Sequence, residues 1–127
     1  MDKISLLKED FKNAVLQLES ALARISDDPL IQAGCIQYFE FCFELAWKTV
    51  KQAVTDQGLA DCYSPKACLQ QAFAMGWIEN EKIWLDMLEA RNRMTHTYNQ
   101  AAAMKIYARL TEFLREFQNL DKRLITI

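Results

Sequence analysis

The stretch that decides the fold is residues 35–54, CIQYFEFCFELAWKTVKQAV. This stretch is apolar on almost every side of a helix. Its polar exceptions form one narrow stripe at helical spacing: Gln37, Glu40, Glu44, Lys48 and Lys51. A helix that is apolar on most sides is a central helix, so we expect it in the middle of a bundle, or also at a subunit interface.

The residues that flank this stretch predict where the helix begins and ends. Asp28 is a good N-cap, Pro29 suits the first helical position, and Gly58 is a typical C-terminal stop. We therefore expect a long helix from about Pro29 to Gln57.

A helix is also expected before this one, over residues 2–25, with a break at 26–29. Its apolar residues repeat at alternating spacings of three and four, as in helices that pack into bundles. They are Ile4, Leu7, Phe11, Ala14, Leu18, Ala21 and Ile25.

Three further helices are predicted after the central one. A loop over 59–64 precedes a short helix that opens at Ser64-Pro65 and ends at Gly76. Asn80 caps a helix over 81–96, and Asn99 caps a long final helix that runs to about residue 124. The final helix carries apolar residues at heptad spacing: Ile106, Leu110, Phe113, Phe117, Leu120 and Leu124.

These elements predict an all-α protein, an antiparallel bundle of four long helices plus one short helix. The length of 127 residues suits a single domain over 1–127. The content of 3 glycines and 2 prolines argues against an all-β fold, which needs many turns.

Charge and cysteine content restrict the class of protein. The net charge of -2 excludes a general polycation for nucleic acid, and no apolar run approaches the roughly 20 residues that cross a bilayer. The start of the chain lacks the apolar stretch of a signal peptide, so we expect a cytoplasmic protein without membrane contact. The four cysteines form no C-x-x-C pair, so we expect free thiols and no zinc site.

The densest group of chemically able side chains surrounds the single histidine, His96. Helical spacing places Trp84, Leu88, Arg91, Thr95 and Tyr98 on one face, so an apolar stripe becomes polar near the helix end. Asn92 and His96 lie beside that face. A structural reading is also open: His96 as a capping or surface residue, and Arg91 as an ion-pair partner of Glu44 or Glu89.

The pattern formed by Arg91, His96 and Tyr98, with the polar residue Asn92, resembles the R-x4-H-x-Y motif of the HEPN superfamily, in the branch called HepT. A narrower resemblance is to the bacterial nucleotidyltransferase substrate-binding protein family. It rests on FEFCFELAWK at 39–48, Ser64-Pro65 and RNRMTHTYN at 91–99, and it covers nearly the whole chain.

This resemblance implies a HEPN-like, all-α homodimer that works beside a cognate minimal nucleotidyltransferase of the MntA type. It implies a metal-independent ribonuclease toxin with Arg91 and His96 as catalytic residues and with no cofactor. The nucleotidyltransferase would act as antitoxin by transferring AMP units to Tyr98.

The residue types suit such a reaction on RNA. His96 can act as general base or acid, and Arg91 can stabilise negative charge on a phosphorane. Asn92 can donate a hydrogen bond to phosphate, and Tyr98 can stack on a base. Glu40 and Glu44 are the second choice as acids or bases, although a solvated stripe or partners for Lys48 and Arg91 is the simpler interpretation of them.

One histidine per chain cannot be both acid and base, whereas a two-fold dimer supplies two. We therefore expect the motif to face the dimer axis. Two other functions stay open at this point. One is a non-catalytic subunit that docks a nucleotidyltransferase and binds its substrate or nucleotide, and the other is a helical dimer with a scaffold role only.

Overall fold

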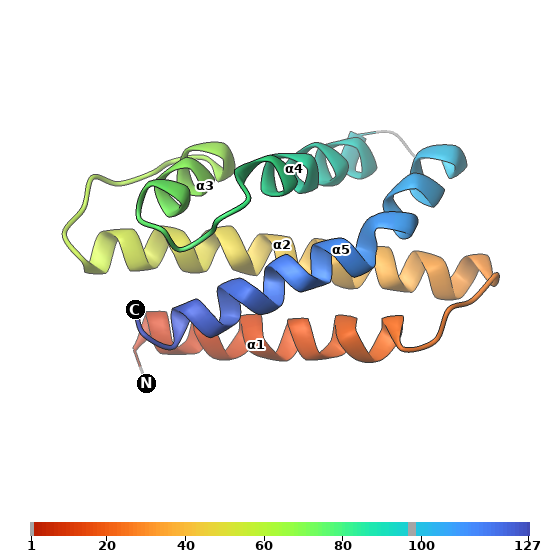
Figure 1. The fold of residues 1–127 in the computed structure, drawn as a ribbon, viewed down its shortest axis with the longest axis horizontal. Coiled ribbons are helices and arrows are strands. Elements are labelled where there is room, and N and C mark those ends of the chain that lie inside the picture. Colours follow the sequence, from red (N-terminus) through yellow and green to blue (C-terminus); the bar gives the residue numbers. More distant parts are fainter. Residues whose placement is uncertain (1, 97–98) are drawn as a thin grey trace.

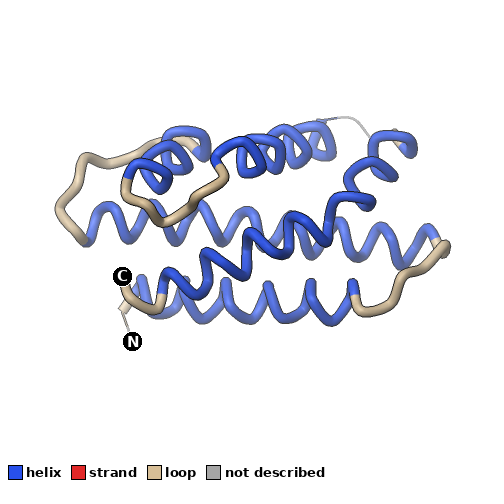
Figure 2. The backbone as a smooth tube through the Cα atoms, viewed as in Figure 1, coloured by secondary structure: helices blue, strands red, loops and turns tan. Residues whose placement is uncertain are grey.

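The computed structural model describes residues 2–96 and 99–127, except for the side chain of His96. These residues form five helices in the order α1 (Lys3–Leu22), α2 (Pro29–Asp56), α3 (Pro65–Ala74), α4 (Glu81–His96) and α5 (Gln100–Leu124). The described residues contain no strand (Figure 2). The all-α expectation is therefore confirmed.

The helices are arranged around α2. Figure 1 shows α1 alongside α2, with α3 and α4 following one another along another side of α2 and α5 crossing the bundle diagonally. Helix α2 contacts each of the other four helices, whereas α1 contacts only α2 and α5. The central position expected for the apolar stretch 35–54 is therefore confirmed.

Side-chain caps begin the helices at the residues that the sequence indicates. Asp28 accepts a hydrogen bond from the backbone N–H of Leu30, and Ser64 accepts one from Ala67. Asn80 and Asn99 cap α4 and α5 in the same way. Each cap satisfies a backbone donor that the first turn of a helix leaves free.

Aromatic rings join the helices in the core. Phe39 of α2 stacks on Phe113 of α5, with ring centroids 5.3 Å apart. Phe117 of α5 makes edge contacts with Phe11 of α1 and Trp84 of α4, at 6.2 and 5.5 Å between centroids. Each buried ring of this kind contributes roughly 1.5–3 kcal/mol, so this cluster connects the four long helices.

The first helix is shorter than expected. It ends at Leu22, not at residue 25, and Ile25 is 93% exposed, so the expectation that Ile25 continues the buried seam was wrong. The chain leaves the helix after Leu22 and turns through Ser26, whose hydroxyl accepts a hydrogen bond from the backbone N–H of Asp28, the N-cap of α2.

The expectation of four free thiols was wrong for two of them. Cys62 and Cys68 form a disulfide with their Cα atoms 5.2 Å apart. The turn at Ser64-Pro65 brings Cys62 back beside the first turn of α3, and that separation lies within the range of about 4.4–6.8 Å that a disulfide spans. Cys35 and Cys42 are free and buried, as expected.

No helix among the described residues combines the length and the apolar character that a membrane span requires.

Candidate functional site

Arg91 lies in the second half of α4, on the side that faces α2. The stripe that contains it begins with Trp84, which is buried, and Leu88, which is half-buried. The Arg91 side chain is 26% exposed, and Thr95 is fully at the surface. The predicted change from an apolar to a polar stripe along α4 is therefore confirmed for the residues that the structure describes.

Glu44 of α2 holds the Arg91 guanidinium. Nε of Arg91 donates to Oε1 of Glu44 at 2.7 Å, and Nη2 lies 2.5 Å from the same oxygen. The other carboxylate oxygen, Oε2, accepts a hydrogen bond from Trp47 Nε1 at 3.0 Å. Of the two partners that the sequence offered Arg91, Glu44 is the one that the structure supports, and Trp47 fixes that carboxylate in turn.

Asn92 is the second polar contact of Arg91. Nη1 of Arg91 donates to Oδ1 of Asn92 at 3.0 Å, and the Asn92 side chain is exposed. A guanidinium has five N–H donors, and the contacts with Glu44 and Asn92 occupy three of them. The other two donors of this planar fork have no partner among the described residues, and two donors in one plane suit a phosphate.

Glu40 completes a group of charges at this position. It lies one turn before Glu44 on α2, and it is half-buried. Burial raises the pKa of the Glu40 carboxyl, the Arg91 cation opposes that rise, and the Glu44 carboxylate adds to it. Two carboxylates therefore face one arginine. At a given pH, the raised pKa makes Glu40 more readily protonated than an exposed glutamate.

Glu40 also borders a cavity of about 310 Å³. The walls come from the first half of α2, from Met94 near the end of α4 and from the first turns of α5. Glu40 thus links the Arg91–Glu44 pair to a cavity at the end of the bundle where α4 gives way to α5.

The remaining residues of the predicted site are only partly described. His96 is the last residue of α4, one turn after Asn92, and its side chain lies outside the described part of the structure. Tyr98 also lies outside the described residues. The structure therefore brings Arg91, Asn92, Glu40 and Glu44 together, and their geometry toward the imidazole and the phenol stays a prediction.

Sequence reasoning missed the role of Trp47. Its spacing of three from Glu44 places both on one side of α2, and a buried indole N–H usually needs a hydrogen-bond acceptor. The spacing of Glu44 and Trp47 could therefore have predicted this hydrogen bond from the sequence.

We predict that Glu40→Gln stabilises the protein at neutral pH and not in acid. A carboxyl group with a raised pKa in the folded state stabilises the fold when protonated, and that contribution is lost as pH rises through the folded-state pKa. Glutamine mimics the protonated form at every pH. Because Glu40 is partly solvated, the gain should stay below about 1 kcal/mol.

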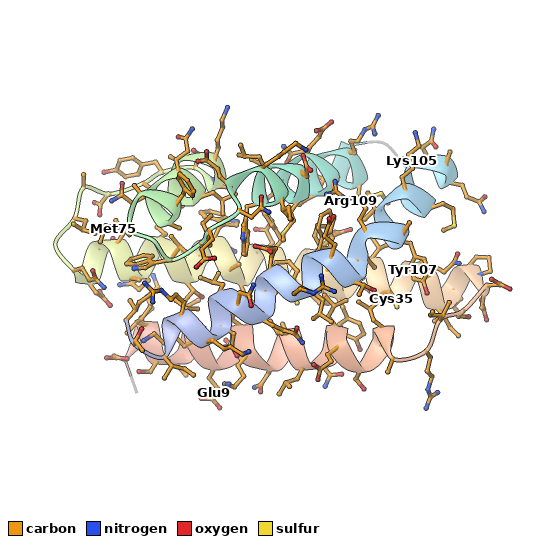
Figure 3. The ribbon with its side chains drawn as sticks, in the orientation of Figure 1. Glu9, Cys35, Met75, Lys105, Tyr107 and Arg109 are labelled. Atoms are coloured by element: carbon orange, nitrogen blue, oxygen red, sulfur yellow. A yellow bond between two sulfur atoms is a disulfide. The ribbon has the colours of Figure 1, made fainter. Side chains whose placement is uncertain are left out.

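Urea denaturation of both proteins from about pH 4 to about pH 8 measures this difference. Glu9→Gln is the matched control, since it removes a glutamate that is exposed on α1 (Figure 3). The opposite result would be a Glu40→Gln protein that is less stable than wild type, with a difference in the free energy of unfolding that grows as pH rises. That result would show that attraction to Arg91 outweighs the cost of burying the Glu40 carboxylate.

Comparison with known proteins places this chain in a family. Residues 8–126 match the family described as nucleotidyltransferase substrate binding protein like. A Haemophilus influenzae protein named probable ribonuclease HepT is 33% identical over 139 aligned positions, which cover 97% of this chain and 93% of that protein.

Two solved structures share the fold. A Thermus thermophilus protein superimposes with a TM-score of 0.83 at 26% identity, covering 90% of this chain and 98% of its own. A Haemophilus influenzae structure, described as the fold of a substrate binding domain of a nucleotidyltransferase, superimposes with a TM-score of 0.80 at 31% identity, over 92% and 98%. Since the family match spans nearly all of the sequence, this chain belongs to the nucleotidyltransferase substrate binding protein family.

Proposed function

We propose that this protein is the HepT-like subunit of a two-component minimal nucleotidyltransferase system. In this proposal it is a metal-independent endoribonuclease toxin that an MntA-like nucleotidyltransferase neutralises by AMP transfer to Tyr98. The name of the Haemophilus relative and the family membership support the proposal. The observation that carries it is Arg91, which Glu44 holds in place and which keeps two donors without a partner among the described residues.

The chemistry starts from the RNA itself. The 2′-OH attacks the adjacent phosphorus, the bond to the 5′-oxygen breaks, and a cyclic phosphate forms. His96 removes the 2′ proton as general base, and a second acid returns a proton to the departing 5′-oxygen. Arg91 donates its two free N–H groups to the phosphorane oxygens, where the negative charge increases.

A homodimer supplies the second acid, because each chain has one histidine. The exposed side of α2 next to Glu44 suits such an interface. Phe41 is 48% exposed there and makes an edge contact with the ring of Tyr38. Aromatic side chains are enriched in protein interfaces, so we place the dimer axis beside Phe41 and the Arg91–Glu44 pair.

AMP transfer to Tyr98 would block this site. The modification adds a phosphate and a base two residues after His96, so it would repel the RNA phosphate and fill the space that RNA needs. RNA and nucleotides are both cytoplasmic, and the cytoplasm is our proposed location. The Cys62–Cys68 disulfide is compatible with it because both sulfur-bearing residues are at most 5% exposed, which limits attack by thiols.

A second function has its own support. The Haemophilus structure is described as a substrate binding domain of a nucleotidyltransferase. This description supports the second proposal, a non-catalytic subunit that docks a nucleotidyltransferase and holds its substrate or nucleotide. Such a subunit would bind the enzyme and a nucleotide without any RNA cleavage that depends on Arg91 or His96.

We expect the purified dimer to cleave RNA in EDTA and to leave a cyclic phosphate. His96→Ala and Arg91→Ala should each lower the cleavage rate by at least about 100-fold, because each removes a group that acts on the transition state. Arg115→Ala, which removes an exposed arginine from α5, should retain the wild-type rate. Cleavage that needs a divalent metal, or that survives His96→Ala, would refute the catalytic assignment.

We expect protein that is co-expressed with the cognate nucleotidyltransferase to gain mass in steps of one AMP. Tyr98→Phe should abolish these additions, because it removes the accepting hydroxyl group. Tyr63→Phe is the control, since Tyr63 is 80% exposed on the loop before α3 and should leave the additions unchanged. Intact mass spectrometry gives the result, and AMP on the Tyr98→Phe protein would place the acceptor elsewhere.

A further inference from the structure

A groove of about 830 Å³ runs between α4 and the start of α5, with α3 at one end. This volume is within the range of about 300–1,000 Å³ that is common for ligand sites. In Figure 3, Lys105 marks the position of the groove near the start of α5, beside the end of α4. The groove lies on a different side of α4 from Glu44, which contacts Arg91.

Three cations from three different helices line this groove: Lys66 of α3, Arg93 of α4 and Lys105 of α5. All three are exposed, and none forms an ion pair with any residue in the described part of the chain. Glu89 is the acidic residue in the lining. A local positive charge thus stands out in a protein whose net charge is -2.

The nearby Arg109 differs in this respect from the three cations of the groove. Arg109, one turn after Lys105 on α5, forms ion pairs with Asp86 and Glu112. The carboxylates of these pairs offset the positive charge of Arg109 and leave little electrostatic attraction for an anionic ligand. The unpaired cations of the groove keep their positive electrostatic field, and such a field attracts polyanions.

The lining of the groove also includes apolar side chains, beside the polar residues Glu89, Asn92 and Asn99. Leu85 and Leu88 of α4 face Ala101 and Ala102 of α5 there. A track of cations beside apolar surface suits a single nucleic-acid strand, since the cations bind phosphates and the apolar side chains pack against sugars and bases. A double helix of RNA keeps the faces of its bases stacked inside, so they could not pack against this apolar surface.

Asn92 connects the groove with the motif. It lines the groove, it accepts a hydrogen bond from Arg91, and it lies one turn before His96 at the end of α4. A strand that occupies the groove would therefore reach the phosphate-binding donors of Arg91.

We propose that the groove binds the sugar–phosphate backbone of single-stranded RNA that flanks the bond to be cut, through Lys66, Arg93 and Lys105. This inference rests on the proposed ribonuclease function and extends it to residues outside the motif. It assigns substrate affinity to the groove and the chemical step to Arg91 and His96.

The test compares the triple variant Lys66→Gln, Arg93→Gln, Lys105→Gln with a matched control, Lys3→Gln, Arg115→Gln, Lys122→Gln. The control removes two lysines and one arginine that are also exposed and that form no ion pair with described residues. The probes are a labelled single-stranded RNA oligonucleotide and ATP. Binding is measured by fluorescence anisotropy over a series of salt concentrations, and cleavage of the same RNA is measured in EDTA.

Three phosphate contacts should account for about 2 units of the slope of log affinity against log salt, at about 0.7 per contact on a single strand. The triple variant of Lys66, Arg93 and Lys105 should lose about 2 units of slope, and it should bind RNA about tenfold more weakly than wild type at moderate salt. At saturating RNA its cleavage rate should stay near wild type. The control triple should keep most of the slope.

An unchanged slope in the groove triple, with RNA cleavage intact in wild type, overturns this inference alone. Loss of ATP affinity with RNA affinity retained also overturns it, because the groove would then hold a nucleotide. A wild-type protein that neither binds nor cleaves RNA overturns the proposed function together with the inference.

Discussion

The ion pair between Arg91 of α4 and Glu44 of α2 is the interaction on which the candidate site depends. An arginine side chain has several rotatable bonds, so a guanidinium must be held if it is to receive a phosphate in one orientation. Glu44 holds two of its nitrogens, and Trp47 holds the opposite oxygen of Glu44. The orientation of Arg91 is thus fixed from the central helix of the bundle.

The same arrangement explains the charge distribution near the motif. Glu40 is a second carboxylate beside a single arginine, and burial favours its protonated form. The free cations lie on the other side of α4, toward α5, where Arg93 and Lys105 line a groove. Helix α4 therefore separates a group of mixed charges, which positions Arg91, from a group of cations, which attracts phosphate.

The fold could be predicted from the sequence because its helices depend on local features. Asp28, Ser64, Asn80 and Asn99 are side chains that cap a helix within a few residues of themselves. The prediction that Ile25 is buried was wrong, because a periodic pattern shows which face of a helix is apolar but not whether a neighbouring helix covers that face. The prediction of free thiols was wrong for Cys62 and Cys68, because a disulfide depends on how close a turn brings two residues, and sequence spacing alone does not give that distance.

The site was predictable in part. The register of α4 placed Arg91 and Thr95 on one polar stripe, and the sequence offered Glu44 as a partner for Arg91. The groove was not predictable, because Lys66, Arg93 and Lys105 come from three helices and meet only through packing. Residues on one helix are thus related by spacing, whereas residues on different helices are related by the tertiary structure.

The most direct test of this account is a double-mutant cycle on Glu44→Gln and Arg91→Gln, with the free energy of unfolding measured in urea. If Glu44 holds Arg91, the two changes should be coupled by about 0.5–1 kcal/mol, a value that suits a partly exposed pair. Free energies that add to within about 0.3 kcal/mol would contradict the account, because they would show that Arg91 is positioned without Glu44.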